Sequence, residues 1–201
     1  MRHWRGSFAL LTIVFVSCSP STAERPWADQ VAFDRAAKDR SFRESPDSPL
    51  PAGSKSAFGG LSYFGVDEAY RVPASLVVAP ADGRAVVKMP TSTGQIRDMV
   101  RVGRLAFSLK GQALQLSAFI EAGEPRLDRL FVPFSDLTTG RESYAGGRYL
   151  DLSRSPSGVY ELDFNRAYHP YCLYNPKYDC PFPPPENRLP VAVRAGERLP
   201  D

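Results

Sequence analysis

Histidine is scarce in this chain, and the signatures of the common catalytic classes are missing. His3 belongs to the basic start of the chain, so His169 is the histidine left for the body of the protein. The sequence has no HExxH metalloprotease motif, no GxSxG nucleophile elbow, no phosphate loop and no dinucleotide fingerprint. These absences argue against zinc proteolysis, serine hydrolysis and nucleotide chemistry in their usual forms, and we expect no cofactor.

Long apolar runs are also missing, apart from Phe8 to Val16 near the start. This run follows basic residues, precedes small ones, and is shorter than the ~20 apolar residues that span a bilayer. Residues 1–23 are therefore predicted to be a secretory signal, and residues 24–201 a single β-rich domain. A short buried helix is the alternative, but nothing amphipathic accompanies the run.

Cysteine is rare, and Cys18 stands directly after the apolar run, in "FVSC". This stretch resembles a bacterial lipobox, although Phe15 stands where Leu is usual. Cleavage after Ala23 is the alternative, and it would remove Cys18. We favour lipidation of Cys18, which predicts a protein exported to the periplasm or cell envelope and attached to the membrane through a lipid anchor only.

Charge of one sign is not in excess. The 25 Lys and Arg residues include Arg2 and Arg5, so 23 basic residues face 22 acidic ones after the signal. The two signs are interleaved, as on a solvated surface, and no basic field remains for nucleic acid. The partners that remain are a small molecule or an envelope protein.

Nineteen prolines and 15 glycines predict many turns and little helix. One helix is expected over Arg25 to Ser45, because Trp27, Val31, Lys38 and Phe42 form one stripe at helical spacing. Its mixed polar face indicates packing on the domain rather than on a membrane.

From Ala57 onward, short alternating runs predict roughly eight to ten strands. The expected fold is mainly β, an antiparallel sandwich or partly closed barrel with one N-terminal helix. Residues 69–79 and 85–89 are expected to form a hairpin, and residues 96–102, 104–110 and 112–120 a meander. Further strands are expected at residues 129–134, 147–152, 159–164 and 189–195.

Residues 165–189, "NRAYHPYCLYNPKYDCPFPPPENRL", hold the chemically densest stretch. Three interpretations are open: Cys172 and Cys180 form a disulfide, the two bind a metal together with His169, or Cys172 is a nucleophile activated by His169. The C-x7-C spacing is wide for a zinc hairpin and too few ligands are present, so we expect no metal site. An even pair in an exported protein favours the disulfide.

The proline-rich part of this stretch, Cys180 to Pro190, is typical of polyproline II. It is predicted to be a stiff strap over the sheet, with Phe182 and Leu189 turned inward. The alternative is a docking motif for an aromatic groove.

Three longer segments resemble the exported prokaryotic family DUF1684, which has no established activity. They are "FSDLTTGRESYAGGRYLDL", "YELDFNRAYHPYC" and "CPFPPPENRLPVAVRAGE", between Phe134 and Glu197. His169 departs from the family pattern, where Asn is usual, which argues against a histidine mechanism shared by the family. The resemblance nominates a set of polar positions: Asp136, Arg148, Asp163, Asn165, Arg166, Tyr168, Cys172, Cys180 and Asn187.

These polar residues have two interpretations. In the first they form a buried network that satisfies backbone groups of the strap. In the second they line a pocket where an Arg holds an anion, oriented by Tyr168 and Asn165. The candidate ligand-binding residues are Arg148, Asp163, Asn165, Arg166, Tyr168 and Asn187.

We therefore expect a non-enzymatic cell-envelope protein that binds a small molecule or a partner. The alternative is a hydrolase-like enzyme built on Arg148, Asp163 and Tyr168. An enzyme requires an open cleft in which a carboxylate with a perturbed pKa faces a positive group.

The disulfide gives a direct prediction. The intact mass of the exported protein should rise by two hydrogen atoms on treatment with a reductant, because the bond between Cys172 and Cys180 opens. A pair that is already reduced in the exported protein would contradict the prediction.

Overall fold

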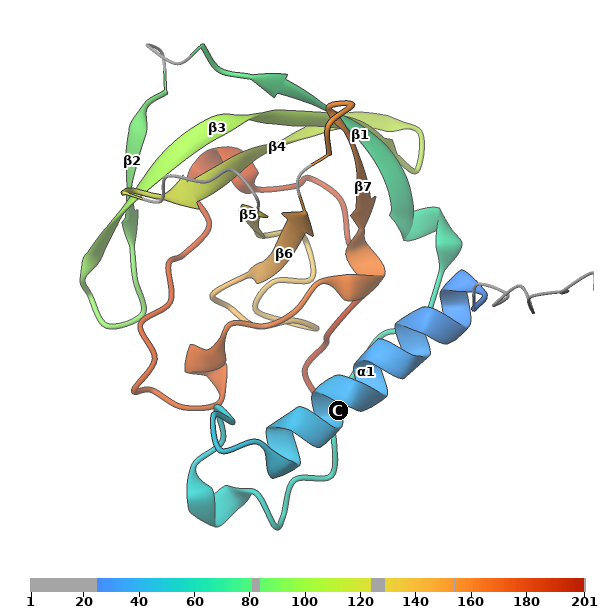
Figure 1. Cartoon of the computed structure of the whole chain (residues 1–201), viewed down its shortest axis with the longest axis vertical. Helices are drawn as coiled ribbons and strands as arrows, with labels where there is room; N and C mark the ends of the chain where they lie inside the picture. The colour runs from blue at the N-terminus through green and yellow to red at the C-terminus, as the bar shows by residue number, and fades with distance from the viewer. Residues whose placement is uncertain (1–24, 81–83, 124–128, 154, 201) are drawn as a thin grey trace, which may run out of the picture.

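The computed structural model describes residues 25–80, 84–123, 129–153 and 155–200. The predicted signal and Cys18 lie outside these residues. None of the helices described is long and apolar enough to cross a membrane. The prediction of a mainly β fold with one N-terminal helix is confirmed: the described strands form a nearly closed antiparallel barrel, with the helix at one side (Figure 1).

The helix α1 (Trp27–Glu44) agrees with its predicted range. Val31 and Phe42 are its buried residues, and both belong to the predicted stripe. Trp27, at the start of the same stripe, donates a hydrogen bond to Asp163. Lys38, in its middle, donates one to Glu197. The helix therefore packs on the domain, as its mixed polar face indicated.

The described strands follow one another around the barrel in the order β6-β5-β4-β3-β1-β7, with β2 paired to β3 outside this path. Their bounds are β1 (Arg71–Val78), β2 (Val86–Pro90), β3 (Ile96–Leu109), β4 (Gln112–Glu121), β5 (Arg129–Phe134), β6 (Arg148–Ser153) and β7 (Val159–Asp163). Short 3-10 helices are η1 (Ala52–Ser54), η2 (Glu68–Tyr70), η4 (Phe164–Arg166), η5 (Tyr171–Leu173) and η6 (Pro185–Asn187).

The predicted hairpin between residues 69–79 and 85–89 is wrong. β1 pairs with residues 103–107 of β3, and β2 pairs with residues 96–100 of the same strand. The two strands thus lie end to end along one edge of β3, where a hairpin would have placed them side by side. β3 is long enough for both because Gly103 does not end it, contrary to the predicted meander.

A β-bulge between Arg101 and Gly103 explains how β3 continues. The extra residue in the ladder with β4 bends the strand, as bulges do in barrels, and at the same place the neighbour along the opposite edge changes from β2 to β1. Gly103 is needed here because a Cβ on it would lie 2.3 Å from the Val77 carbonyl oxygen.

Residues 189–195, predicted as a closing strand, form no strand. Their segment is attached to the residues after β5 by two backbone hydrogen bonds, from Leu189 N to Ser135 O and from Leu137 N to Val191 O, and to Arg148 by side-chain bonds. Every second residue of this segment is nevertheless buried in the core: Leu189, Val191, Val193 and Ala195. The apolar alternation therefore reflects packing against the core and not pairing with a neighbouring strand.

The sheet is apolar on both faces over part of its area. Inside the barrel lies the main core, with residues such as Leu105, Leu116, Leu130 and Leu162. On the outside, a second cluster of Met89, Met99 and Phe119 is packed by Val87 and Phe131; we call these five residues the outer cluster. An outer face that is apolar needs a cover, and residues 168–181, the covering segment, supply it.

Gly103→Ala should lower the free energy of unfolding by about 2 kcal/mol or more, because the new methyl group overlaps the backbone of β1. Urea denaturation measures the change. Gly65→Ala is the control, since no atom lies within 4 Å of its Cβ position, and it should change stability by less than about 0.5 kcal/mol. Equal stability of the two variants would contradict the role given to the bulge.

Candidate functional site

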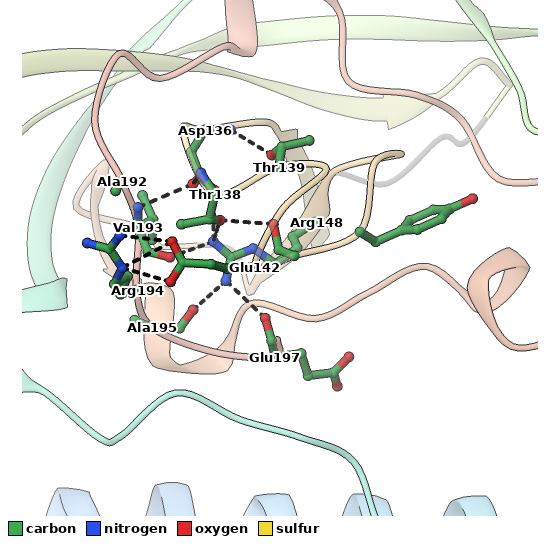
Figure 2. A network of polar contacts seen from close by, with 12 residues as sticks. Asp136, Thr138, Thr139, Glu142, Arg148, Ala192, Val193, Arg194, Ala195 and Glu197 are labelled. Atoms are coloured by element: carbon green, nitrogen blue, oxygen red, sulfur yellow. Dashed lines mark hydrogen bonds and ion pairs between the residues drawn. The ribbon is translucent and has the colours of Figure 1, made fainter. Parts of the chain in front are cut away.

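Arg148 opens β6, and its side chain is completely buried. Its terminal nitrogens donate to the carbonyls of Val193 (2.6 Å), Ala195 (2.5 Å) and Glu197 (3.1 Å). The same guanidinium pairs with Asp136 at 2.8 Å. Figure 2 shows the guanidinium enclosed by these groups of the C-terminal segment. Arg148 therefore holds the chain itself, and its terminal nitrogens are not free to bind an anion.

Asp136 completes this network. Its second oxygen accepts hydrogen bonds from the backbone N–H groups of Thr138 (2.7 Å) and Val193 (3.3 Å) (Figure 2). Burial lowers the pKa of Arg148, and the neighbouring Asp136 opposes that shift. For these two residues the interpretation as a buried network describes the structure.

Asp163, Asn165 and Arg166 form a second, separate junction. One oxygen of Asp163 accepts from the backbone and side-chain nitrogens of Asn165, both at 3.0 Å. The other accepts from the Trp27 indole at 2.9 Å and from Arg166 at 3.2 Å. The Asn165 amide also bonds the N–H and C=O of Asp67. This junction ties α1 and the segment before β1 to the end of β7.

Asn187 repairs a gap in the sheet. β4 and β5 are paired at Phe119 and Phe131, and two residues further along, this register brings Ser117 opposite Pro133, which has no N–H to donate. The Asn187 amide lies there, accepting from Ser117 N at 2.7 Å and donating to Ser117 O (2.9 Å) and Pro133 O (2.7 Å). A side chain thus replaces a ladder bond in the barrel wall.

Tyr168 lies elsewhere, in an open cleft of about 580 Å³ between the outer face of the sheet and the covering segment. Its hydroxyl donates to Asp151 at 2.8 Å, and burial together with this carboxylate raises the pKa of Tyr168. The cleft is lined by Lys38, Arg97, Met99, Phe119, Ile120, Glu121, Arg129, Phe131, Tyr149, Asp151, Tyr168, Pro170, Tyr171, Tyr178, Asp179, Cys180 and Pro181.

Aromatic rings form much of the cleft wall. Tyr149 packs edge-on against Phe131, with centroids 4.7 Å apart, and against Tyr168 at 5.7 Å. From the covering segment, Tyr171 packs against Tyr178 at 5.3 Å. The Tyr149 hydroxyl donates to the Pro181 carbonyl at 2.6 Å, which holds the covering segment against β6.

The cleft lining holds equal numbers of positive and negative side chains. Lys38, Arg97 and Arg129 are positive, and Glu121, Asp151 and Asp179 are negative. Arg97 pairs with Asp179 at 3.1 Å, and Arg129 lies 3.5 Å from Asp151. Lys38 reaches past the cleft to the buried Glu197 at 2.6 Å.

Cys172 and Cys180 are both free thiols in the structure, so the predicted disulfide is not formed there. They lie next to each other, and the Cys180 sulfur accepts the backbone N–H of Cys172 at 3.2 Å. Burial raises the pKa of Cys180 to about 12, so this thiol is protonated and a poor nucleophile.

His169 is buried and neutral. Its Nε2 accepts the backbone N–H of Tyr144 at 3.2 Å. Burial, with the charges of Arg148 and Lys38, lowers the pKa of His169 to about 3. An Asn carbonyl offers the same kind of acceptor as this neutral imidazole nitrogen. Among the described residues, no group of His, Cys, Asp and Glu is arranged to hold a metal ion.

The structure therefore distributes the nominated residues over four places: the Arg148 network, the Asp163 junction, the Asn187 position between β4 and β5, and the cleft. A smaller cavity of about 200 Å³ beside α1 is lined by Asn165, Arg166 and Tyr168 together. Of the six ligand-binding candidates, Tyr168 lines the cleft; Arg148, Asp163, Asn165, Arg166 and Asn187 do not. Sequence reasoning missed Phe131, Tyr149 and Arg97. Phe131 and Tyr149 carried a signal, because they are large aromatics at strand positions that alternate with core residues such as Leu130 and Leu150.

The fold and cleft define a small, nearly closed antiparallel β-barrel whose outer face carries a covered aromatic cleft. Residues 56–198 match the family described as protein of unknown function (DUF1684), and the chain belongs to this family, as its motifs indicated. It is also similar to the solution NMR structure of an uncharacterized protein from gene locus rrnAC0354 of Haloarcula marismortui. That match has 41% identity and a TM-score of 0.67, and covers 86% of this chain and 94% of the other. None of the curated proteins matches this chain.

Arg148→Met should destabilise the protein by roughly 3–5 kcal/mol, because Asp136 and three carbonyls lose their buried donor. Urea denaturation measures this loss. Arg194→Ala is the matched control, since its ion pair with Glu142 is exposed and should contribute less than about 1 kcal/mol. Similar losses in both variants would show that the buried network is not what holds the C-terminal segment.

Proposed function

We propose that this protein is an exported, lipid-anchored protein of the cell envelope that binds a small ligand in the cleft of about 580 Å³. The observation that carries the proposal is the cleft itself, whose volume falls within the ~300–1,000 Å³ usual for ligand pockets. Its lining combines several aromatic rings with a few convergent charged groups, as such pockets do.

The anchor and the cysteine pair belong to the same proposal. Lipidation of Cys18 would leave residues 19–26 as the connection to α1, so the domain would lie within about 30 Å of its anchor. In an oxidising compartment, Cys172 and Cys180 would join. That bond would fix the covering segment, which forms one wall of the cleft.

The alternative is the hydrolase-like enzyme. It needs Arg148, Asp163 and Tyr168 around one substrate, and these side chains contact three different sets of partners. The binding function therefore has the better support. A protein partner that inserts a side chain into the cleft is compatible with the same geometry.

The test is to fill the cleft without touching the core. Glu121 is exposed at the end of β4 and lines the cleft, so Glu121→Trp should occupy it. Gln115→Trp, exposed on the same strand but outside the cleft lining, is the matched control. The measurement is an NMR screen of small neutral, anionic and cationic fragments against the isotope-labelled protein.

Fragments that bind should shift backbone signals of β4, β5 and β6 around the cleft in a saturable way. These shifts should be lost in Glu121→Trp and kept in Gln115→Trp. If no fragment perturbs the cleft, or if binding survives the Trp at position 121, the ligand-binding proposal is wrong.

A further inference from the structure

We infer that the ligand of this cleft is a neutral, polyhydroxylated molecule: a saccharide ring or short glycan. The inference rests on the proposed binding function, and it names the chemical class of the ligand, which that proposal leaves open. Three properties of the cleft carry it, namely its charge balance, the hydrogen-bonding capacity that its ion pairs retain, and its aromatic walls.

The charge balance disfavours an anionic ligand. Each positive side chain of the cleft already has a carboxylate partner: Arg97 has Asp179, Arg129 has Asp151, and Lys38 has Glu197. An anion would have to compete with a carboxylate that stays in place, and repulsion from that carboxylate would offset the attraction. The sequence-based expectation of an Arg that holds an anion therefore does not transfer to this cleft.

A cationic ligand meets the opposite difficulty. Aromatic walls can bind a cation over a ring face, but the Lys38 ammonium already lies 4.6 Å from the centroid of the Tyr168 ring. The carboxylates of Asp151 and Asp179 are likewise engaged by guanidinium groups. Glu121 is the lining carboxylate that forms no ion pair among the described residues, and a cation drawn to it would still face the positive charges of Lys38, Arg97 and Arg129.

A hydroxyl group fits the ion pairs as they stand. Arg97 contacts Asp179 through one terminal nitrogen, Nη2, which leaves its remaining N–H groups as donors. Tyr168 and Arg129 both contact one oxygen of Asp151, Oδ2, so lone pairs remain on that carboxylate. A hydroxyl both donates and accepts, and neighbouring hydroxyls on a ring can bridge such groups without separating the charges.

The aromatic walls of the cleft suit the C–H face of a sugar ring. A pyranose ring presents C–H groups on its face and hydroxyls at its edge, so it packs well on an aromatic ring surrounded by polar groups. Tyr171 is 40% exposed, and Phe131 and Tyr178 are half-buried, so parts of these rings remain open to a ligand. Rings come from both the sheet and the covering segment, which places apolar surface on two sides of the cleft.

The experiment compares ligands of one ring shape and three charges. Glucose, glucosamine and glucuronate, with N-acetylglucosamine, cellobiose and maltose as further neutral probes, are titrated into the labelled protein and followed by NMR. We expect at least one neutral saccharide to bind in the cleft with a Kd in the millimolar range or tighter. The charged analogues of glucose should bind about tenfold more weakly than the neutral sugar, or not at all.

Asp151→Asn should weaken binding of that neutral saccharide about tenfold, because the acceptor paired with Tyr168 and Arg129 is altered. Glu161→Gln, an exposed carboxylate of β7 paired with Arg71, is the control and should leave binding unchanged. Thermal unfolding of both variants shows whether each is folded.

The outcomes separate the inference from the proposed function. If glucuronate or glucosamine binds more tightly than every neutral sugar, or if fragments bind the cleft and no saccharide does, the ligand class is wrong and the binding function stands. If neither fragments nor saccharides bind, both are wrong. Saccharide binding that persists unchanged in Asp151→Asn places the ligand outside this cleft and also overturns the inference.

Discussion

The buried guanidinium of Arg148 is the interaction on which the rest of the site depends. It removes a positive charge from water, and this is tolerable because Asp136 and three backbone carbonyls surround it. In return, a segment without regular secondary structure is fixed across the barrel end. The last of those carbonyls belongs to Glu197, so the position of the Glu197 side chain follows from the Arg148 network.

Glu197 connects the Arg148 network to the residues that form the wall of the cleft. Its buried carboxylate accepts from the backbone of His169 at 2.7 Å, from Lys38 at 2.6 Å and from the Tyr174 hydroxyl at 3.2 Å. Two of these residues belong to the covering segment and one belongs to α1. A charge network buried at the barrel end therefore positions the wall of a cleft on the barrel's outer face, although Arg148 never reaches that cleft.

The floor of the cleft is formed by β4 and β5, and a side chain replaces a missing backbone hydrogen bond between these strands. Pro133 interrupts the ladder between β4 and β5, and the Asn187 amide fills the gap. Without that amide, Ser117 and Pro133 would lose the link between β4 and β5, which are paired at Phe119 and Phe131 in the described ladder. The same segment that supplies Asn187 begins at Pro181, where Tyr149 fastens it to β6. Floor and wall are thus held by side chains rather than by continuous strand pairing.

The amino-acid sequence by itself determined the helix, most of the strands, the inward alternation of the core and the family. These are local patterns: the helical stripe of α1 and the period of two in β3, β4 and β5 depend on neighbours a few residues away. It also selected polar positions that matter. Local pattern did not distinguish Arg148, which is sealed in the interior, from Tyr168, which lines the cleft.

Only the tertiary structure decided that difference. The carbonyls that enclose Arg148 lie 45 to 49 residues away in the chain. The aromatic and charged groups of the cleft likewise come from α1, four strands and the covering segment. Whether a side chain is enclosed or open depends on which distant segments pack over it, and in this protein the segments that do so have no secondary-structure period to reveal their course. Most strands could therefore be predicted from the sequence, whereas the cleft between the sheet and the covering segment could not.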